Sequence, residues 1–270
     1  YIMALRPVIY YPDVGKIDKV FNHQGDSGRE LVREWEKLGL VSICKSPIPF
    51  MVWDNKFIMY DFDTEYQLTN SSIDKRTTPI YTGNELIKSC NPWTYWSRHP
   101  KTLHEHYDMP VKSYEQRDID SIFIGNIENS VQAKWRSVEW EKCVSRFHMT
   151  NGPGNRTFSH DDYLKLLARS KYGLCLRGYG PKCNREIELL ALGTVLIVTP
   201  GVDTVNYINP LQENIHYIKV NTPEEITKKI SNISIDKWSE MSHACQRWYN
   251  ANSSPYGSFK LTKDLTGYII

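Results

Sequence analysis

Two short apolar segments that flank a compact helical pattern constrain the fold of this chain most strongly. Residues 174–176 read LCL and residues 195–198 read VLIV, which is typical of strands buried on both faces. The residues between them end in Gly193, a glycine that suits the end of a helix. A strand, a helix and a second strand in immediate succession predict a βαβ crossover with parallel strands.

The alternation of strands and helices starts twice along the 270 residues. The first series begins with PVIYYPD at 7–13 and the second with DSIFIGNI at 120–127. Alternating strands and helices favour an α/β protein, so we expect two parallel-sheet units. The predicted units are residues 1–115, with the tail 250–270 packing back on them, and residues 116–249. A chain of this length suits two domains of about 130 residues each.

Apolar spacing predicts helices over 29–40, 130–144, 159–170 and 235–249. In the third of these, Ser159 is the expected N-cap, with an acidic residue three positions later. The residues NHQGDSG before the first helix are expected to form a loop, and so is the His-rich stretch before the second unit.

Composition excludes several classes of function. The net charge is +2, which gives no polyelectrolyte signature for nucleic acid, and no apolar run approaches the ~20 residues of a membrane-spanning helix. The six cysteines have no C-x-x-C spacing, and no signal-peptide pattern opens the chain, so free thiols and a cytoplasmic location are expected. The four N-x-S/T sequons are interpreted as chance matches.

The candidate functional residues follow the first strand of the βαβ unit. Arg177 follows that strand, Asn184 is the expected N-cap of the helix, and Arg185 falls in its first turn. Helix-end amides beside an arginine suit a diphosphate. Glu188 lies on the same side of the helix and can accept hydrogen bonds from ribose hydroxyls. The alternative is a simple intrahelical pair of Arg185 and Glu188.

Other residues of the second unit complete the expected nucleotide site. Gly125 and Asn126 follow the first strand, where a missing side chain would let the sugar phosphate come close. Gly178 relaxes the loop after Arg177, and Tyr179 is expected to contact the base near the turn at 150–152.

The run 170–198 resembles the signature of exostosin-like glycosyltransferases. The matching residues are Ser170, Lys171, Tyr172, Cys175, Leu176, Gly178, Arg185, Glu188, Gly193 and Val198. The likeness extends weakly to FIGN at 123–126 and to Arg136, and it departs at Leu192 and at Thr194-Val195. In its short length and lack of an anchor, the chain is similar to the exostosin-like sugar transferases of large algal viruses, which include a xylosyltransferase.

The resemblance implies a GT-B fold, in which two Rossmann-like domains face a cleft. It implies an inverting transferase that moves a sugar, xylose as the best guess, from a UDP-sugar to a hydroxyl of an oligosaccharide or glycoprotein glycan. The UDP-sugar would lie on the C-terminal domain and the acceptor on the N-terminal one. No metal would be required, since arginines and helix-end amides stabilise the leaving diphosphate.

The resemblance also places a general base in the loop before the first helix, where it takes a proton from the acceptor hydroxyl. Asp26 is the first choice, His23 the second and Asp13 the third. Asp26 or Ser27 capping the helix is the structural alternative.

Three other interpretations stay open. Asp61-x-Asp63 has the spacing of a Mn²⁺-binding motif in transferases of another fold. His99, His104 and His106 cluster, although their spacing matches no trusted zinc pattern, and a polar acceptor-side loop is preferred. A non-catalytic nucleotide- or carbohydrate-binding module would keep the arginine and glutamate pocket but lack a base.

Overall fold

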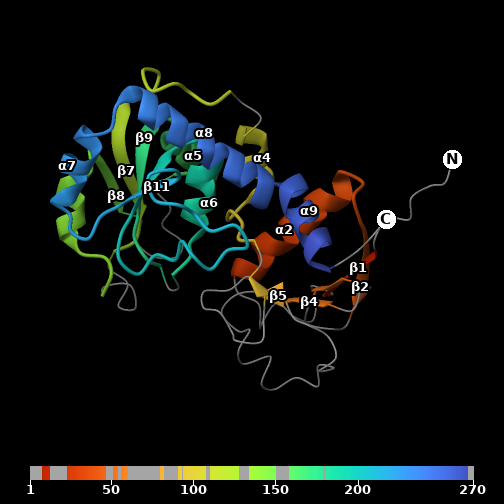
Figure 1. The fold of residues 1–270 in the computed structure, drawn as a ribbon. Helices are drawn as coiled ribbons and strands as arrows, with labels where there is room; N and C mark the ends of the chain where they lie inside the picture. Colours follow the sequence, from red (N-terminus) through yellow and green to blue (C-terminus); the bar gives the residue numbers. More distant parts are fainter. Residues whose placement is uncertain are drawn as a thin grey trace. The chain divides into compact units, whose positions relative to one another are not determined.

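The computed structural model divides the chain into two compact units (Figure 1). Unit 1 comprises Tyr1–Lys101, Asn206–Asn209 and Ala251–Ile270, and unit 2 comprises Thr102–Val205 and Pro210–Asn250. The structure describes residues 8–12, 23–46, 51–53, 56–59, 80–81, 91–92, 94–107, 110–127, 134–149, 158–178 and 181–266.

Unit 2 is built on a five-stranded parallel sheet. The strands are β7 (Ile119–Gly125), β8 (Arg146–Met149), β9 (Ser170–Cys175), β10 (Val195–Val198) and β11 (Tyr217–Lys219). Their spatial order is β11-β10-β9-β7-β8, and every neighbouring pair is parallel. This confirms the predicted α/β class and the predicted βαβ crossover, and the sheet is compatible with a Rossmann-like fold.

The strand order creates a switch point between β7 and β9. The chain passes outward from β7 to β8 and then crosses back to the other side of β7 to form β9. In sheets of this kind the crossovers on the two sides of such a point run in opposite directions, which leaves a crevice at the carboxyl ends of the strands. Ligands of open α/β sheets bind in that crevice.

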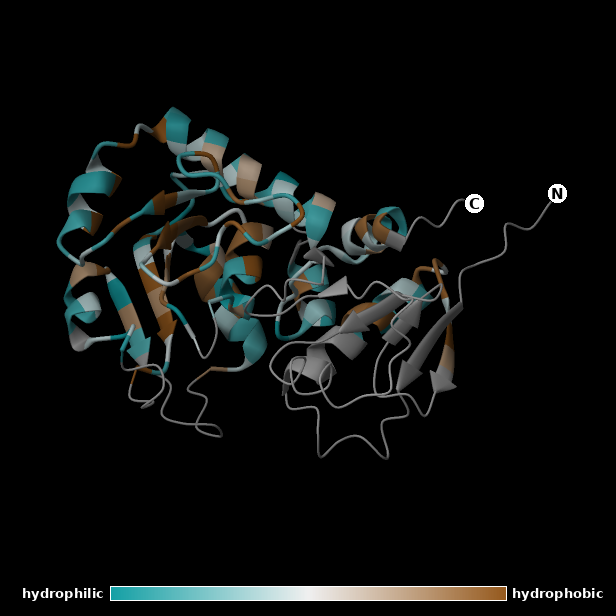
Figure 2. Cartoon of the chain, turned by 60° about the horizontal axis from the view of Figure 1, so that its bottom comes forward, coloured by the Kyte–Doolittle hydropathy of each residue, from teal (hydrophilic) through white to brown (hydrophobic). Residues whose placement is uncertain are grey.

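Helices cover both faces of this sheet (Figure 1). On one face lie α5 (His160–Ala168) and α6 (Asn184–Ala191), and on the other α7 (Glu225–Ser231) and α8 (Ile235–Asn252). The α6 helix packs closely, because a Cβ added to Gly173 would lie 2.3 Å from Leu189. The strand β10 is apolar and buried along its whole length, and Figure 2 shows brown segments within the strands of this sheet. This pattern is expected of a sheet buried on both faces.

Local signals explain some helix ends and not others. Ser159 caps α5 as predicted, and its Oγ accepts a hydrogen bond from the Asp162 amide at 3.1 Å. The helix predicted over 130–144 is wrong: its described part holds only the 3₁₀ helix η1 (Val138–Cys143). The physical reason is Arg136, which binds backbone carbonyls at the ends of two strands and holds the preceding turn away from helical geometry.

Unit 1 has a six-stranded sheet whose described strands are short. They are β1 (Val8–Pro12), β2 (Ser42–Ser46), β3 (Met51–Trp53), β4 (Lys56–Met59), β5 (Ile80–Tyr81) and β6 (Asn91–Pro92). Their order is β2-β1-β3-β4-β5-β6, and β3 is antiparallel to both β1 and β4. The expectation of a parallel sheet is therefore wrong here. Only two residues separate β3 from β4, too few for the crossover that parallel strands need.

Two helices that are far apart in sequence share the core of unit 1. They are α2 (His23–Lys37) and α9 (Pro255–Thr266). Trp35 of α2 packs edge-on against Phe259 of α9 at 6.1 Å, and its Nε1 donates a hydrogen bond to Ser258 Oγ at 3.0 Å. In the part of the chain that the structure describes, no helix is both long enough and apolar enough to cross a membrane.

Candidate functional site

Three arginines gather at the switch point of unit 2, where β7 and β9 end. Arg136 precedes η1, Arg177 follows β9, and Arg185 is the second residue of α6. The parallel sheet brings them together because the carboxyl ends of β7 and β9 lie side by side. Each arginine has a different set of contacts.

Arg136 holds the two strand ends together. Its Nε donates to the Arg177 carbonyl at 2.7 Å, Nη1 to the Asn126 carbonyl at 2.5 Å, and Nη2 to the Leu176 carbonyl at 3.3 Å. Burial, and then the nearby charge of Arg185, lower the pKa of this guanidinium to about 10. The side chain still carries its charge at neutral pH, so Arg136 contributes both geometry and positive potential.

Arg185 reaches from α6 back to β7. Its Nη2 donates to the Ile124 carbonyl at 2.9 Å, and its guanidinium carbon lies 4.4 Å from the centre of the Phe123 ring. The Nε and Nη1 atoms are buried, and neither has a hydrogen-bond partner among the described residues. A buried guanidinium with unused donors is costly, and an anion in the crevice would supply the missing acceptors.

The contacts around Gly125 give a different reason for a glycine at this position from the one expected. A Cβ at this position would lie 2.6 Å from Arg185 Nη2 and 3.0 Å from the Phe123 ring. The glycine therefore makes room for the arginine, and the expectation that it lets a sugar phosphate approach is not needed to explain it.

Arg177 is held by an aromatic ring at the rim of the cluster. Its guanidinium carbon lies 5.0 Å from the centre of the Trp135 ring, and Nη1 donates to the Gly201 carbonyl at 3.4 Å. Gly178, the next residue, is buried. Such stacking fixes the direction of a long side chain, so Arg177 is preorganised beside Arg136 and Arg185.

The N-cap of α6 is Cys183, one residue before the expected Asn184. The Cys183 amide donates to the Glu186 carboxylate, which closes a capping box, and this reciprocal contact decides where the helix begins. Glu186 is buried; burial raises the pKa of its carboxyl to about 7, and the charges of Arg185 and Arg136 limit the rise. This acid is therefore partly protonated at neutral pH and only partly offsets the arginines.

Glu188 faces α5 and not Arg185. Its Oε2 accepts a hydrogen bond from Tyr163 Oη at 2.8 Å, and its Oε1 lies 3.9 Å from His160 Nε2. Arg185 meanwhile reaches β7, so the geometry does not favour the intrahelical pair as the explanation of these residues. Glu188 is buried near the first turns of α5 and α6, which start at the same edge of the sheet.

The proposed bases and the acidic motif belong to the residue range of unit 1. His23 and Asp26 fall within α2 of unit 1, so the loop expected there is helical. The dipole of a helix stabilises acidic residues near its start. The two glycines of NHQGDSG did not prevent helix formation. Asp13, Asp61, Asp63, Tyr179 and the turn at 150–152 lie outside the described residues.

His104 and His106 lie in a helix where a loop was expected, since α4 spans Pro100–Tyr107, and His99 precedes that helix. His106 is buried and its Nε2 lies 2.5 Å from Asp161 Oδ1. Within the described ranges, no group of three or more His, Cys, Asp or Glu side chains is arranged to hold a metal ion.

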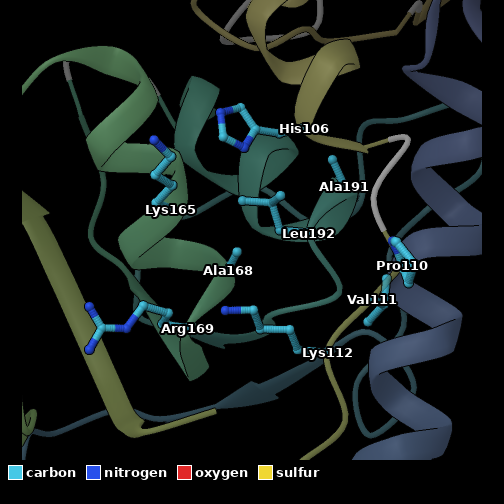
Figure 3. Close-up of a pocket in the computed structure, with 9 residues that line it drawn as sticks. All are labelled: His106, Pro110, Val111, Lys112, Lys165, Ala168, Arg169, Ala191 and Leu192. Carbon is cyan, nitrogen blue, oxygen red and sulfur yellow. The ribbon is translucent and has the colours of Figure 1, made fainter. Parts of the chain in front are cut away.

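A separate cavity of about 380 Å³ lies at the far ends of α5 and α6 (Figure 3). Its lining residues are His106, Pro110, Val111, Lys112, Lys165, Ala168, Arg169, Ala191 and Leu192. His106 and Lys165 both contact Asp161. Arg169 contacts Asp118. Acidic neighbours therefore offset the charges of Lys165 and Arg169 in this cavity.

Sequence reasoning missed Phe123, Trp135, His160 and Tyr163 as members of the site. Trp135 directly precedes Arg136, and Tyr163 lies three residues after His160, about one helical turn. Neither spacing predicts a ligand-binding site. No family model and no curated protein matches this chain. The likeness to exostosin-like transferases therefore depends on the motif residues alone.

Proposed function

We propose that the chain is an inverting, metal-independent glycosyltransferase that uses a UDP-sugar, with xylose as the sugar to test first. The observation that carries the proposal is Arg185, whose buried Nε and Nη1 lack partners among the described residues at the switch point. Arg136 and Arg177 add positive charge at the same place. A diphosphate is the ligand group that matches several preorganised guanidinium donors.

The same groups suit the chemistry of sugar transfer. An acceptor hydroxyl attacks the anomeric carbon, the bond from that carbon to the diphosphate oxygen breaks, and a general base takes the hydroxyl proton. Negative charge grows on the leaving diphosphate, so fixed positive charge stabilises the transition state more than the ground state. Asp26, His23 and Asp13 remain the proposed bases, and the two-domain GT-B arrangement, with a glycan acceptor on unit 1, is part of this proposal.

A binding screen tests the proposal directly. Calorimetry with UDP, GDP, UMP and UDP-xylose should show that the wild-type chain prefers UDP over UMP, because the second phosphate engages the arginines. Slow hydrolysis of UDP-xylose by the pure protein should accompany binding. Glu188→Ala should weaken UDP binding by about tenfold through the lost ribose contact.

The outcomes separate the alternatives. UDP binding without any hydrolysis or transfer would favour a non-catalytic nucleotide-binding module. Equal affinity for UDP and UMP, or none for either, would contradict a diphosphate site at the arginine cluster.

A further inference from the structure

Glu188 is an unusual residue for its position in α6. Its neighbours Ile187, Leu189 and Leu190 are apolar and fully buried, and Glu188 itself is only 2 % exposed. Burying a carboxylate costs on the order of several kcal/mol unless hydrogen bonds compensate. A carboxylate at this position needs a positioned hydrogen-bond donor, and Tyr163 supplies one.

The contact between the two helices is directional. Tyr163 Oη lies 2.8 Å from Oε2 of Glu188, while His160 Nε2 lies 3.9 Å from the other oxygen, Oε1. The phenol O–H donates, because a carboxylate can only accept. Burial and the nearby Glu188 charge raise the pKa of Tyr163 well above its ordinary value, so the hydroxyl keeps its proton. A carboxylate has about four acceptor positions, so one hydroxyl donor does not by itself exclude further donors.

The donor is itself held rigidly. The Tyr163 amide donates to the Ser159 carbonyl at 3.0 Å, and Ser159 caps the helix through the Asp162 amide. The His160 ring lies 5.5 Å from the Tyr163 ring at a tilt of 31°. These contacts fix the first turn of α5, and with it the direction from which Tyr163 Oη meets Glu188.

We propose that Tyr163 is a positioning residue for ribose recognition: it orients the Glu188 carboxylate so that this group accepts hydrogen bonds from the ribose hydroxyls of a bound ribonucleotide. The inference rests on the proposed function, since it assumes that the nucleotide lies at the carboxyl edge of unit 2. It adds that selectivity for ribose is set from α5, a helix that the sequence motif does not include.

The test measures, in one set of titrations, how much the ribose hydroxyls and the second phosphate each contribute to affinity. Wild type, Tyr163→Phe and Tyr172→Phe are titrated with UDP, 2′-deoxy-UDP, 3′-deoxy-UDP and UMP. Tyr172→Phe is the matched control, because it removes another tyrosine hydroxyl from the same unit, and Tyr172 is buried in the core that includes Trp238 of α8. Urea unfolding of each variant verifies that it is folded.

Tyr163→Phe should lower UDP affinity by about tenfold and leave affinity for at least one deoxy nucleotide nearly unchanged, so the preference for ribose collapses. The ratio of UDP to UMP affinity should stay at the wild-type value, and Tyr172→Phe should change neither ratio.

Four results would overturn the inference. The first is a Tyr163→Phe variant that keeps the wild-type preference for ribose, which would show that Glu188 does not depend on Tyr163. The second is a Tyr163→Phe variant that binds all four nucleotides equally more weakly, which would mark Tyr163 as a packing residue only. If wild type binds UDP but does not distinguish it from either deoxy form, Glu188 does not read the ribose. A wild type that binds no UDP refutes the proposed function itself, and this inference falls with it.

Discussion

Arg117 and Arg185 lie at opposite edges of the same parallel sheet; Arg117 is buried as a whole, and Arg185 is half-buried with its Nε and Nη1 inside the protein. At the amino edge, Arg117 Nη1 donates to the Ser170 carbonyl at 2.7 Å and to Thr194 Oγ1 at 2.9 Å. Its Nη2 donates to the Leu192 carbonyl at 2.8 Å, and its Nε donates to a backbone carbonyl at 3.1 Å. Arg185 at the carboxyl edge has one such bond, through Nη2, and two buried nitrogens without a partner among the described residues.

The two edges differ in how many nitrogens of the arginine have an acceptor. Every nitrogen of Arg117 has an acceptor from the protein, so the amino edge is complete as folded. Arg185 is held in place by one carbonyl and by the Phe123 ring, but its Nε and Nη1 have no acceptor among the described residues. An incompletely bonded buried charge reduces stability. Under the proposed function, the diphosphate would bring the acceptors that these two nitrogens need.

The largest effect is expected from Arg117→Met. This change leaves three carbonyls and a hydroxyl without their donor, so the free energy of unfolding should fall by about 3–5 kcal/mol. Urea unfolding measures it. The control is Arg169→Met, which breaks an exposed ion pair with Asp118 and should cost no more than about 1 kcal/mol. A loss below about 1 kcal/mol for Arg117→Met would end the contrast between the edges.

Arg185→Met should have the opposite profile. Turnover of the donor should fall by ~10²-fold or more, which corresponds to about 2.7 kcal/mol of transition-state stabilisation. The free energy of unfolding should stay within about 1 kcal/mol of wild type, because the lost hydrogen bond is offset by relief of a buried charge. Steady-state kinetics and urea unfolding of the same preparation measure both. Normal turnover combined with a large loss of stability would make Arg185 a structural residue like Arg117.

Stability should also depend on pH through Glu186. The native pKa of this carboxyl is about 7, above its ordinary value of 4.5, so the native state binds more protons than the unfolded state between these values. The free energy of unfolding contributed by this group is therefore highest below pH 4.5 and falls as pH rises through 7, by about 3–4 kcal/mol in total. Glu186→Gln keeps the cap acceptor and should remove that slope.

His216 also makes the free energy of unfolding depend on pH, so the contribution of Glu186 must be measured as a difference between wild type and Glu186→Gln. Burial lowers the pKa of its imidazole to about 4, so its contribution to stability is lost as pH falls from 6.5 to 4. That trend opposes the one from Glu186 in the same pH range. Subtracting the unfolding free energies of wild type and Glu186→Gln at each pH removes the His216 part. A flat difference from pH 5 to 7.5 would contradict a buried acid at the carboxyl edge.

The smallest effect is expected from metal removal. Donor binding and turnover should be unchanged by EDTA, since the arginines are expected to supply the charge that Mn²⁺ supplies in other transferases. Activity lost on chelation and restored by Mn²⁺ would favour the Asp61-x-Asp63 motif, and it would remove the functional meaning of the contrast between Arg117 and Arg185.

The sequence by itself determined the local elements of unit 2. The runs at 174–176 and 195–198 became adjacent parallel strands, and Ser159 capped its helix, because apolar runs and caps act over a few residues. Arg185 and Glu188 were also identified from spacing, because helical periodicity places them near the start of α6.

Only the tertiary structure decided how those residues are used. Gly125 makes room for Arg185, Arg136 joins two strand ends, and Tyr163 meets Glu188 across two helices. Each of these contacts links residues from separate elements, and no local pattern encodes which element becomes a neighbour. The mixed sheet of unit 1 has the same origin, because strand direction depends on pairing between segments and not on the composition of any one of them.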